Sequence, residues 1–303
     1  MKHPPLFSVI TPISNMAGKL AGLDLWLSTI LKSDSEVILI HDITDEITGP
    51  EVERLWQKHK DENVKLLQGR FGGPGSARNA GIEMAKGIWI SFWDSDDEPN
   101  VMNFLKMVEK ANSTTCEIIV GDFITRSERT NLECKEEFFS ESLAENLNRV
   151  ALNPGIWRMA FRRSFLGGNR FPSSRMGEDQ LLLANLNFYN SKMDFYKDYV
   201  YCYITGNPNQ LTANKSAIND LKEVAKTLLQ KISLTPRSES TYLSIMFIRQ
   251  CLTLLKRGRF DARLFSIWLL LKYFSLALIG RVKVVSPLLT IFKSVQKNRL
   301  GVK

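Results

Sequence analysis

Three carboxylates fall within four residues, directly after an apolar run of strand length. The stretch is GIWISFWDSDDEPN, Gly87 to Asn100, and the acids are Asp94, Asp96 and Asp97. Carboxylates this close repel one another and raise one another's pKa unless a cation or hydrogen-bond donors hold them. Asp and Ser also favour turns, so a plain turn would explain one or two of the acids. A divalent cation such as Mg²⁺ or Mn²⁺, which prefers oxygen ligands, would explain all three.

Apolar runs of strand length alternate with helical patterns over the first 123 residues. Strands are expected at residues 7–13, 36–42, 64–68, 88–93 and 117–123, and helices at 20–32, 50–60, 76–87 and 101–111. Ser76 is expected to cap the third helix, since Ser is a preferred N-cap residue. Short, unbroken apolar strands between helices predict a parallel sheet covered on both faces, which is an α/β fold.

Polar clusters follow three of these predicted strands, at Thr11 to Asn15, His41 to Asp45 and Asp94 to Asp97. The glycine-rich segment RFGGPGSARNAG precedes the helix that leads into the fourth strand. In open α/β sheets, ligands bind outside the carboxyl ends of the strands, so one crevice could collect all four segments. This convergence favours a binding site over a plain turn. The segment resembles a P-loop only superficially, because it lacks the Lys-Ser/Thr ending.

The bulk composition describes a globular chain. With 303 residues, 44% hydrophobic and 24% charged, the chain is long enough for two domains or for one domain with an appendage. Its four cysteines are scattered and it has three histidines, which argues against a disulfide framework and a zinc site. The N-terminal segment has prolines at positions 4 and 5 and lacks the apolar core of a signal peptide. We therefore expect a cytoplasmic protein.

The positive charge is concentrated in the C-terminal region. The net charge is +8, and Arg249 to Lys303 carries twelve Lys or Arg residues against one acid, Asp261. From about residue 218 the chain is expected to be helical, and residues 264–279 form an apolar run of 16 residues interrupted by Lys272. A membrane-spanning helix needs roughly 20 mostly apolar residues, so this run is short. A buried core helix and a helix lying in the membrane plane both stay open.

Basic residues interleaved with Leu, Ile, Phe and Trp favour an anionic membrane surface over nucleic acid as the partner of this region. We therefore expect no nucleic-acid partner. The expected location is peripheral, on the inner face of the cell membrane.

Four motifs in order resemble the family 2 glycosyltransferases of the GT-A fold, of the type that builds bacterial surface polysaccharides. They are SVITPISN, EVILIHDITDE, GSARNAGIEMAKGIWISFWDSDD and MGEDQLLLANL. The resemblance covers about residues 6–215. It implies a Rossmann-like, mixed, mostly parallel sheet with helices on both faces, followed by a helical C-terminal region. The implied domains are a GT-A domain at 1–217, with a nucleotide-binding half at about 1–123 and an acceptor half at about 124–217, and a basic, apolar helical region at 218–303.

The resemblance also implies roles for single residues. Asp179, in GED, matches the general base of the family, and Asp94 and Asp96 match its DxD pair, which faces the ribose and ligates the metal. The residues implied to bind the nucleotide are Thr11, Pro12, Ile13, Asn15, Asp42, Arg78, Asp94 and Ser95. Within this set Asp42 is expected to receive the base, usually uracil, and Arg78 to help close the pocket. Possible diphosphate or acceptor contacts are Glu178, Arg175 and Lys215.

The chemistry of sugar transfer agrees with these roles. A divalent cation, Mn²⁺ or Mg²⁺, stabilises the charge that develops on the leaving diphosphate, and carboxylates can hold it. A carboxylate opposite the leaving group can take the proton of the attacking hydroxyl. The implied function is inverting, metal-dependent transfer of a sugar from a nucleotide-diphosphate donor, expected to be a UDP-sugar. The acceptor would be a hydroxyl of a glycan or a lipid-linked molecule in cell-surface polysaccharide synthesis.

Two departures from the family pattern keep an alternative open. His41 stands where an acid is usual, and no Arg lies between Tyr201 and Asn214, where the family often has one. A catalytically degenerate domain that binds nucleotide sugar or glycan within a complex would explain both. Acids are retained at the DxD and general-base positions, which favours the enzyme. A nucleotidyltransferase is a third possibility, because it also combines a nucleotide crevice with metal-binding carboxylates.

Overall fold

The computed structural model describes residues 3–136, 140–206 and 215–300. The chain forms two compact units. The sheet unit comprises Met1–Phe139, Gly155–Ser173 and Asn190–Asn207, and the helical unit comprises Ser140–Pro154, Ser174–Tyr189 and Pro208–Lys303. Residues 140–154 and 174–189 therefore pack with the C-terminal helices, although they precede residue 217 in the chain. The predicted domain boundary at 217 stays a prediction.

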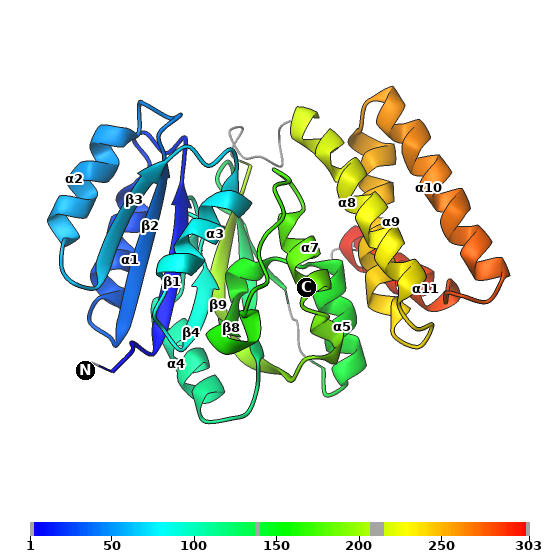
Figure 1. Ribbon diagram of the computed structural model, residues 1–303, viewed down its shortest axis with the longest axis horizontal. Coiled ribbons are helices and arrows are strands. Elements are labelled where there is room, and N and C mark those ends of the chain that lie inside the picture. The colour runs from blue at the N-terminus through cyan, green and yellow to red at the C-terminus, as the bar shows by residue number, and fades with distance from the viewer. Residues whose placement is uncertain (1–2, 137–139, 207–214, 301–303) are drawn as a thin grey trace. The chain divides into compact units, whose positions relative to one another are not determined.

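The sheet unit holds all the described strands (Figure 1). They are β1 (Phe7–Ile13), β2 (Ser35–Asp42), β3 (Val64–Gly69), β4 (Trp89–Phe92), β5 (Glu98–Pro99), β6 (Ile118–Ser127), β7 (Glu133–Glu136), β8 (Met159–Arg162) and β9 (Met193–Thr205). Its helices are α1 (Ala21–Ile30), α2 (Gly49–His59), α3 (Pro74–Met84), α4 (Val101–Asn112) and the single turn α6 (Arg163–Leu166), with a 3₁₀ turn, η1, at Ile156–Arg158. The predicted α/β fold is confirmed.

The strand order is β3-β2-β1-β4-β8-β6-β9-β5, with β7 paired to β6. Strands β1 to β4 pair in parallel, as the alternation of strands and helices predicts. Beyond β4 the sheet is mixed, because β8 runs antiparallel between β4 and β6. The expected strand at 117–123 is therefore part of the sheet, but it does not lie beside β4.

Both faces of the sheet are covered. Apolar side chains of α1, α2 and α4 form one buried core with those of the strands. On the other face α3 packs against β1 so closely that a Cβ added at Gly81 would lie 2.4 Å from Cγ2 of Ile10. Glycine at this position therefore lets the helix approach the strand.

The expected capping role of Ser76 is wrong. Helix α3 begins two residues earlier, with Gly73 as its N-cap, Pro74 in the first turn and no side-chain cap. Proline is favoured at this point because its fixed φ suits a helix and its missing N–H is not needed there. The preceding Gly72 has a φ of 73°, which glycine adopts without steric cost.

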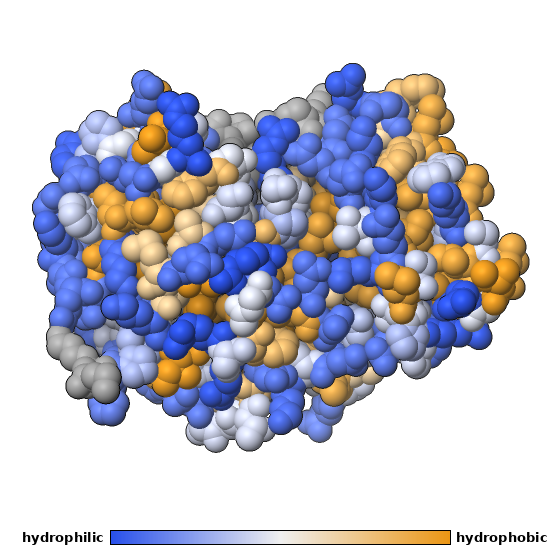
Figure 2. All heavy atoms as spheres, viewed as in Figure 1, coloured by the Kyte–Doolittle hydropathy of each residue, from blue (hydrophilic) through white to orange (hydrophobic). Residues whose placement is uncertain are grey.

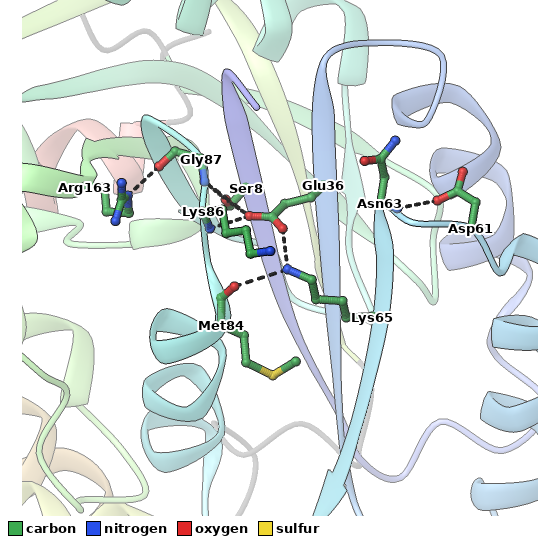
Figure 3. A network of polar contacts seen from close by, with 9 residues as sticks. All are labelled: Ser8, Glu36, Asp61, Asn63, Lys65, Met84, Lys86, Gly87 and Arg163. Carbon is green, nitrogen blue, oxygen red and sulfur yellow. Dashed lines mark hydrogen bonds and ion pairs between the residues drawn. The ribbon is translucent and has the colours of Figure 1, made fainter. Parts of the chain in front are cut away.

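A buried carboxylate holds together the edge of the sheet where the parallel strands begin (Figure 3). Glu36 of β2 accepts hydrogen bonds from the Ser8 hydroxyl of β1 at 2.7 Å and from Nζ of Lys65 of β3 at 2.6 Å. It also accepts from the backbone N–H groups of Lys86 and Gly87, between α3 and β4. Burial raises the pKa of Glu36, but these donors outweigh it and lower the pKa below its ordinary value.

The helical unit contains α5 (Leu143–Leu152), α7 (Glu178–Asn185), α8 (Lys215–Leu234), α9 (Ser240–Arg257), α10 (Phe260–Leu278) and α11 (Val285–Leu300). Helix α9 is its centre, in contact with α5, α8, α10 and α11. Another 3₁₀ turn, η2, lies at Phe188–Asn190. The predicted helical C-terminal region is confirmed. In the part of the chain that the structure describes, no helix combines the length and the apolar character needed to cross a bilayer.

Candidate active site

The polar clusters that follow β1, β2 and β4 lie at one edge of the sheet. Parallel pairing places Ile13 beside His41 and Ile10 beside Phe92, so the three strands end at neighbouring positions. The backbone N–H of Trp93 continues the pairing with a 3.1 Å hydrogen bond to the Ile10 carbonyl. The side chains that follow these strand ends form the candidate site of the sheet unit.

Asp94 and Arg78 form an ion pair at this edge. Nη2 of Arg78 donates to Oδ1 of Asp94 at 2.6 Å, and the Arg78 side chain is 5% exposed while that of Asp94 is 26% exposed. The guanidinium also lies over the ring of Phe171, 5.5 Å from its centroid. Asn79, the next residue of α3, exchanges two hydrogen bonds with the backbone of Phe171. Helix α3 therefore holds the Arg78 side chain against the carboxylate.

A buried tyrosine fixes the backbone of the acidic cluster. The backbone N–H of Asp94 donates to the Tyr201 hydroxyl at 2.9 Å. Tyr201, in β9, is fully buried, and its ring stacks on Trp157 with centroids 4.7 Å apart. Sequence reasoning missed Tyr201, because it lies 107 residues from Asp94 and no local motif links the two.

Asp97 differs from the other two acids of the cluster because it is buried. It is 2% exposed, and its Oδ1 accepts from the backbone N–H of Ile204 at 2.8 Å. Burial, together with the nearby carboxylates of Asp94 and Asp96, raises its pKa well above the ordinary value. Asp97 is buried and its Oδ1 already accepts a hydrogen bond, so it is less accessible to a cation, which leaves the half-buried Asp94 and Asp96 as the candidate metal ligands.

The loops after β1 and β2 are joined by Asp45. Its Oδ2 accepts from the backbone N–H of Asn15 at 2.5 Å, and its Oδ1 accepts from the N–H of Thr48 at 3.3 Å. Asn15 has a φ of 57°, so this contact holds a left-handed backbone conformation that non-glycine residues rarely adopt. Partial burial raises the pKa of Asp45, but the donors around it lower the pKa on balance.

Asp42 ends β2 and is held ionised. Partial burial raises its pKa, but hydrogen bonds from Thr44 and from the backbone of Phe71 and Gly72 outweigh it and lower the pKa. The Thr44 hydroxyl donates to Oδ1 of Asp42 at 2.7 Å. The glycine-rich segment before α3 therefore contacts the Asp42 carboxylate through its backbone.

The other predicted nucleotide contacts differ in exposure. Thr11, Ile13 and Ser95 are buried, Pro12 is half-buried and Asn15 is exposed. Within the described residues the buried Thr11 hydroxyl has no hydrogen-bond partner. The side chains of Thr11 and Ile13 thus belong largely to the core of the sheet unit, and any contact with a ligand would come mainly from the backbone.

The remaining predicted site residues belong to the helical unit. Glu178 and Asp179 open α7, as the sequence predicts, after Gly177 with a φ of 78°. Glu178 is buried and Asp179 half-buried. Acids in a first helical turn also complement the helix dipole, so a structural reason for them exists as well.

Two cations were predicted beside these acids. Arg175 is exposed and forms an ion pair with Asp220 of α8, with Nε 2.9 Å from Oδ2. Lys215 is the first residue of α8, and its side chain lies outside the described residues, as do residues 207–214, where a family Arg was sought. The roles of both cations stay predictions.

The carboxylate oxygens at the sheet edge suit a hard cation that also binds ligands from outside the protein. Among the described residues, no group of three or more His, Cys, Asp and Glu side chains is arranged to hold a metal ion. Mg²⁺ is commonly bound through one or two carboxylates together with substrate phosphates and water, so a complete protein cage is not required. Asp94 and Asp96 stay the predicted pair for such a site.

The family model described as "Glycosyl transferase family 2" matches residues 8–168, just over half of the chain. The uncharacterized glycosyltransferase EpsJ of Bacillus subtilis is 30% identical over 69% of this chain and 63% of its own length. The succinoglycan biosynthesis protein ExoO of Rhizobium meliloti is 31% identical over 50% of this chain and 46% of its own length. The chain therefore matches less than two thirds of the length of either relative.

Two solved structures share the fold at low sequence identity. TarS of S. aureus, crystallised as a fragment with UDP-GlcNAc, superposes with a TM-score of 0.61 at 17% identity, over 84% of this chain and 73% of the other. A mannosyltransferase of Pyrobaculum calidifontis, in complex with GDP-Man and Mn²⁺, superposes with a TM-score of 0.55 at 16% identity, over 99% and 89%. The motif order, the sheet with its carboxylate-bearing edge and the match of the family model lead to one conclusion: this chain belongs to glycosyl transferase family 2.

Proposed function

We propose that the protein is an inverting, metal-dependent glycosyltransferase that takes a sugar from a nucleotide-diphosphate donor, a UDP-sugar. The observation that carries the proposal is the convergence of three strand ends on one edge, where Asp94 is paired with Arg78 and adjoins the half-buried Asp96. Open α/β sheets bind nucleotides at such edges. The UDP complexes of TarS and the GDP-Man complex of the mannosyltransferase support a nucleotide-sugar donor.

The donor is held in this proposal by the loops of the sheet unit. Asp42 is ionised and accepts hydrogen bonds from the base, while the loop of Thr11 to Asn15, braced by Asp45, lines the nucleotide. Asp94 would face the ribose, and Asp94 and Asp96 would hold a divalent cation beside the diphosphate. The cation, when bound, stabilises the negative charge that develops on the leaving diphosphate. Manganese in the mannosyltransferase structure supports this assignment.

The reaction is a direct displacement at the anomeric carbon. A bond forms between the acceptor oxygen and the anomeric carbon, and the bond from that carbon to the diphosphate oxygen breaks. The acceptor hydroxyl gives its proton to the carboxylate of Asp179, and the leaving group departs as the nucleoside diphosphate. One displacement inverts the anomeric configuration. Glu178 and Arg175 are proposed as further contacts to the diphosphate or the acceptor.

The acceptor is proposed to be a hydroxyl of a glycan or of a lipid-linked saccharide in cell-surface polysaccharide synthesis. The succinoglycan role in the name of ExoO supports this acceptor class. A lipid-linked acceptor would place the enzyme as a peripheral protein on the inner face of the cell membrane. The sugar itself and the linkage depend on variable loops.

Calorimetric titration with UDP, with and without Mn²⁺, tests the binding half of the proposal, and transfer from a panel of UDP-sugars tests the catalytic half. Asp96→Asn is expected to lose the Mn²⁺-dependent part of UDP binding, because a carboxylate ligand becomes a neutral amide. Asp179→Asn is expected to keep UDP binding and to lose at least about a hundredfold in turnover, the usual scale for a general base. Glu223→Gln, at an exposed position of α8 in the same helical unit, is the control for Asp179 and should retain turnover.

These binding and transfer measurements separate the competing functions. Metal-dependent UDP binding with no transfer to any acceptor in wild type would support the degenerate binding domain. No binding of UDP, together with binding of GDP or dTDP, would overturn the UDP assignment. Equal binding by wild type and Asp96→Asn would overturn the carboxylate cluster as the metal site.

A further inference from the structure

Helix α10 of the helical unit is apolar on two opposite sides. One side carries Ala262, Ser266, Leu269 and Tyr273, all buried, and packs against α8 and α9. The other side is solvent-exposed and apolar, with Leu264, Ile267, Trp268, Leu271, Phe274 and Leu278. At 3.6 residues per turn, these six residues fall within about a third of the helix circumference, opposite the buried side. An apolar helix side of this extent normally packs against something.

Helix α11 repeats this pattern on a smaller scale. Its exposed apolar residues are Val285, Leu288, Leu289, Phe292 and Val295. They recur at intervals of three and four residues, so they lie along one side of the helix. Two consecutive helices therefore each leave an apolar stripe uncovered. Packing within the helical unit does not require these exposed apolar side chains.

Basic side chains border both stripes. By the same helical spacing, Arg263 and Lys272 lie at the two borders of the α10 stripe, and Lys293 lies at a border of the α11 stripe. Nζ of Lys272 lies 3.8 Å from the centroid of the Trp268 ring, so the cation and the amphipathic indole occupy one spot on the helix surface. The turn between the two helices adds Arg281 and Lys283, both exposed. The exposed apolar surface of the helical unit is visible in the space-filling view along α10 (Figure 2).

We infer that the exposed stripes of α10 and α11, which we call the tail surface, bind the headgroup region of an anionic lipid bilayer with the helices lying in the membrane plane. An apolar stripe bordered by Lys and Arg, with Trp at the boundary, has the composition of an interfacial helix. An anionic bilayer is the partner that would hold the enzyme at the peripheral location expected under the proposed function. The inference rests on the proposed function only for the biological reason to bind a membrane.

The positive charge of the C-terminal region favours a bilayer over a second copy of the chain as the partner of the tail surface. From Arg249 to Lys303 the sequence has twelve basic residues and one acid, so two tail surfaces facing each other would bring like charges together. An anionic leaflet attracts the exposed cations that border the two stripes. The same composition disfavours a basic protein partner.

Co-sedimentation with vesicles tests the inference on the full-length protein. Wild type is expected to bind vesicles of phosphatidylcholine and phosphatidylglycerol in equal parts, and to bind pure phosphatidylcholine vesicles far more weakly. Leu271→Glu with Phe274→Glu is expected to lower binding to the anionic vesicles by at least about tenfold, because two apolar anchors are lost. Arg281→Glu with Lys283→Glu is expected to lower it by at least about tenfold, because each cation near the surface is worth roughly fivefold.

Matched variants on the sheet unit control for charge and exposure. Leu25→Glu with Met102→Glu replaces two other exposed apolar residues, and Lys32→Glu with Lys106→Glu changes the net charge as the basic variant does. Both are expected to bind vesicles as wild type does. Circular dichroism and thermal melting check that every variant is folded.

Three outcomes would overturn the inference: equal binding of wild type to neutral and anionic vesicles, no vesicle binding at all, or equal loss in the tail and control variants. A dimer of wild type that becomes monomeric in Leu271→Glu with Phe274→Glu, without vesicle binding, would assign the tail surface to self-association instead. The vesicle assay does not depend on sugar transfer, so its result can be interpreted even if the donor assay fails. The donor assay can likewise be interpreted if vesicle binding fails.

Discussion

Single carboxylates of the sheet unit are placed in three different environments by their neighbours. Asp42 is kept ionised by backbone and hydroxyl donors, Asp94 is paired with Arg78, and Asp97 is buried with a raised pKa. The motif DSDD shows where these acids gather, and its spacing predicts that they bind a cation. It does not distinguish them, because their partners lie in β9, far along the chain. There the Ile204 N–H donates to Asp97, and the Tyr201 hydroxyl accepts from the Asp94 N–H.

Tyr201→Phe tests the contact that fixes the acidic cluster. The variant keeps the ring that stacks on Trp157 and removes the hydroxyl that accepts from the Asp94 N–H. A buried backbone donor left without a partner costs about 1–3 kcal/mol, so we expect that loss in the free energy of unfolding, measured in urea. We also expect weaker metal-dependent UDP binding, because the backbone that presents Asp94 and Asp96 is no longer held.

Tyr199→Phe, at a largely exposed position of the same strand, is the control and should change neither quantity. A loss of stability with unchanged UDP binding would show that Tyr201 acts on the fold alone.

At the scale of the elements, the parallel strands use their two ends differently. The ends that carry Asn15, Asp42 and Asp94 gather polar side chains for the candidate site, while the other ends are tied together by Glu36 (Figure 3). Glu36 of β2 accepts from β1, from β3 and from the connection between α3 and β4, so one carboxylate satisfies donors from three other segments. The alternation of strands and helices predicts the elements, but it does not predict this junction.

Glu36→Gln is expected to lower the free energy of unfolding at pH 7 by about 2 kcal/mol, the scale of a hydrogen bond to a charged group. Because the folded pKa of Glu36 lies below its ordinary value of 4.5, its stabilising contribution is fully present above that pH. The contribution is lost as the pH falls below 4.5 through the lower folded pKa. Urea unfolding across this range should therefore show the wild type and the variant converging in acid.

Glu109→Gln, at an exposed position of α4, is the control and should shift the unfolding free energy by less than about 0.5 kcal/mol. A stability difference between wild type and Glu36→Gln that stays constant from pH 7 into acid would contradict the assignment of the charge to Glu36.

At the scale of the whole molecule, the charged residues are unevenly distributed between the two units. The basic excess lies in the last helices, while the carboxylates of the candidate metal site lie in the sheet unit.

The four cysteines are distributed over both units, and none forms a disulfide. Three are buried, and burial raises the pKa of Cys202 to about 11 and that of Cys251 to about 12.

Thiol titration should report this distribution. Cys134 is the exposed cysteine, so we expect one equivalent to react rapidly with a chromogenic disulfide reagent in the folded protein and all four to react after unfolding. Buried thiols react slowly because they are shielded and because a raised pKa leaves little thiolate. Cys134→Ser should abolish the fast phase. Rapid reaction of two or more thiols in the folded protein would contradict the packing around Cys116, Cys202 and Cys251.

The sequence by itself determined the α/β class, the parallel pairing of the first strands, the acidic strand end and the basic, apolar helical tail. These follow from local patterns, since hydrophobic period and residue type act over a few neighbouring positions. Only the tertiary structure decided that β8 enters the sheet antiparallel, that residues 140–154 and 174–189 pack with the C-terminal helices, and that Tyr201 holds Asp94. It also decided that α10 is both core and surface, because its two apolar sides look alike in sequence and differ only in what packs against them. Such choices rest on contacts between distant residues, which local propensity does not encode.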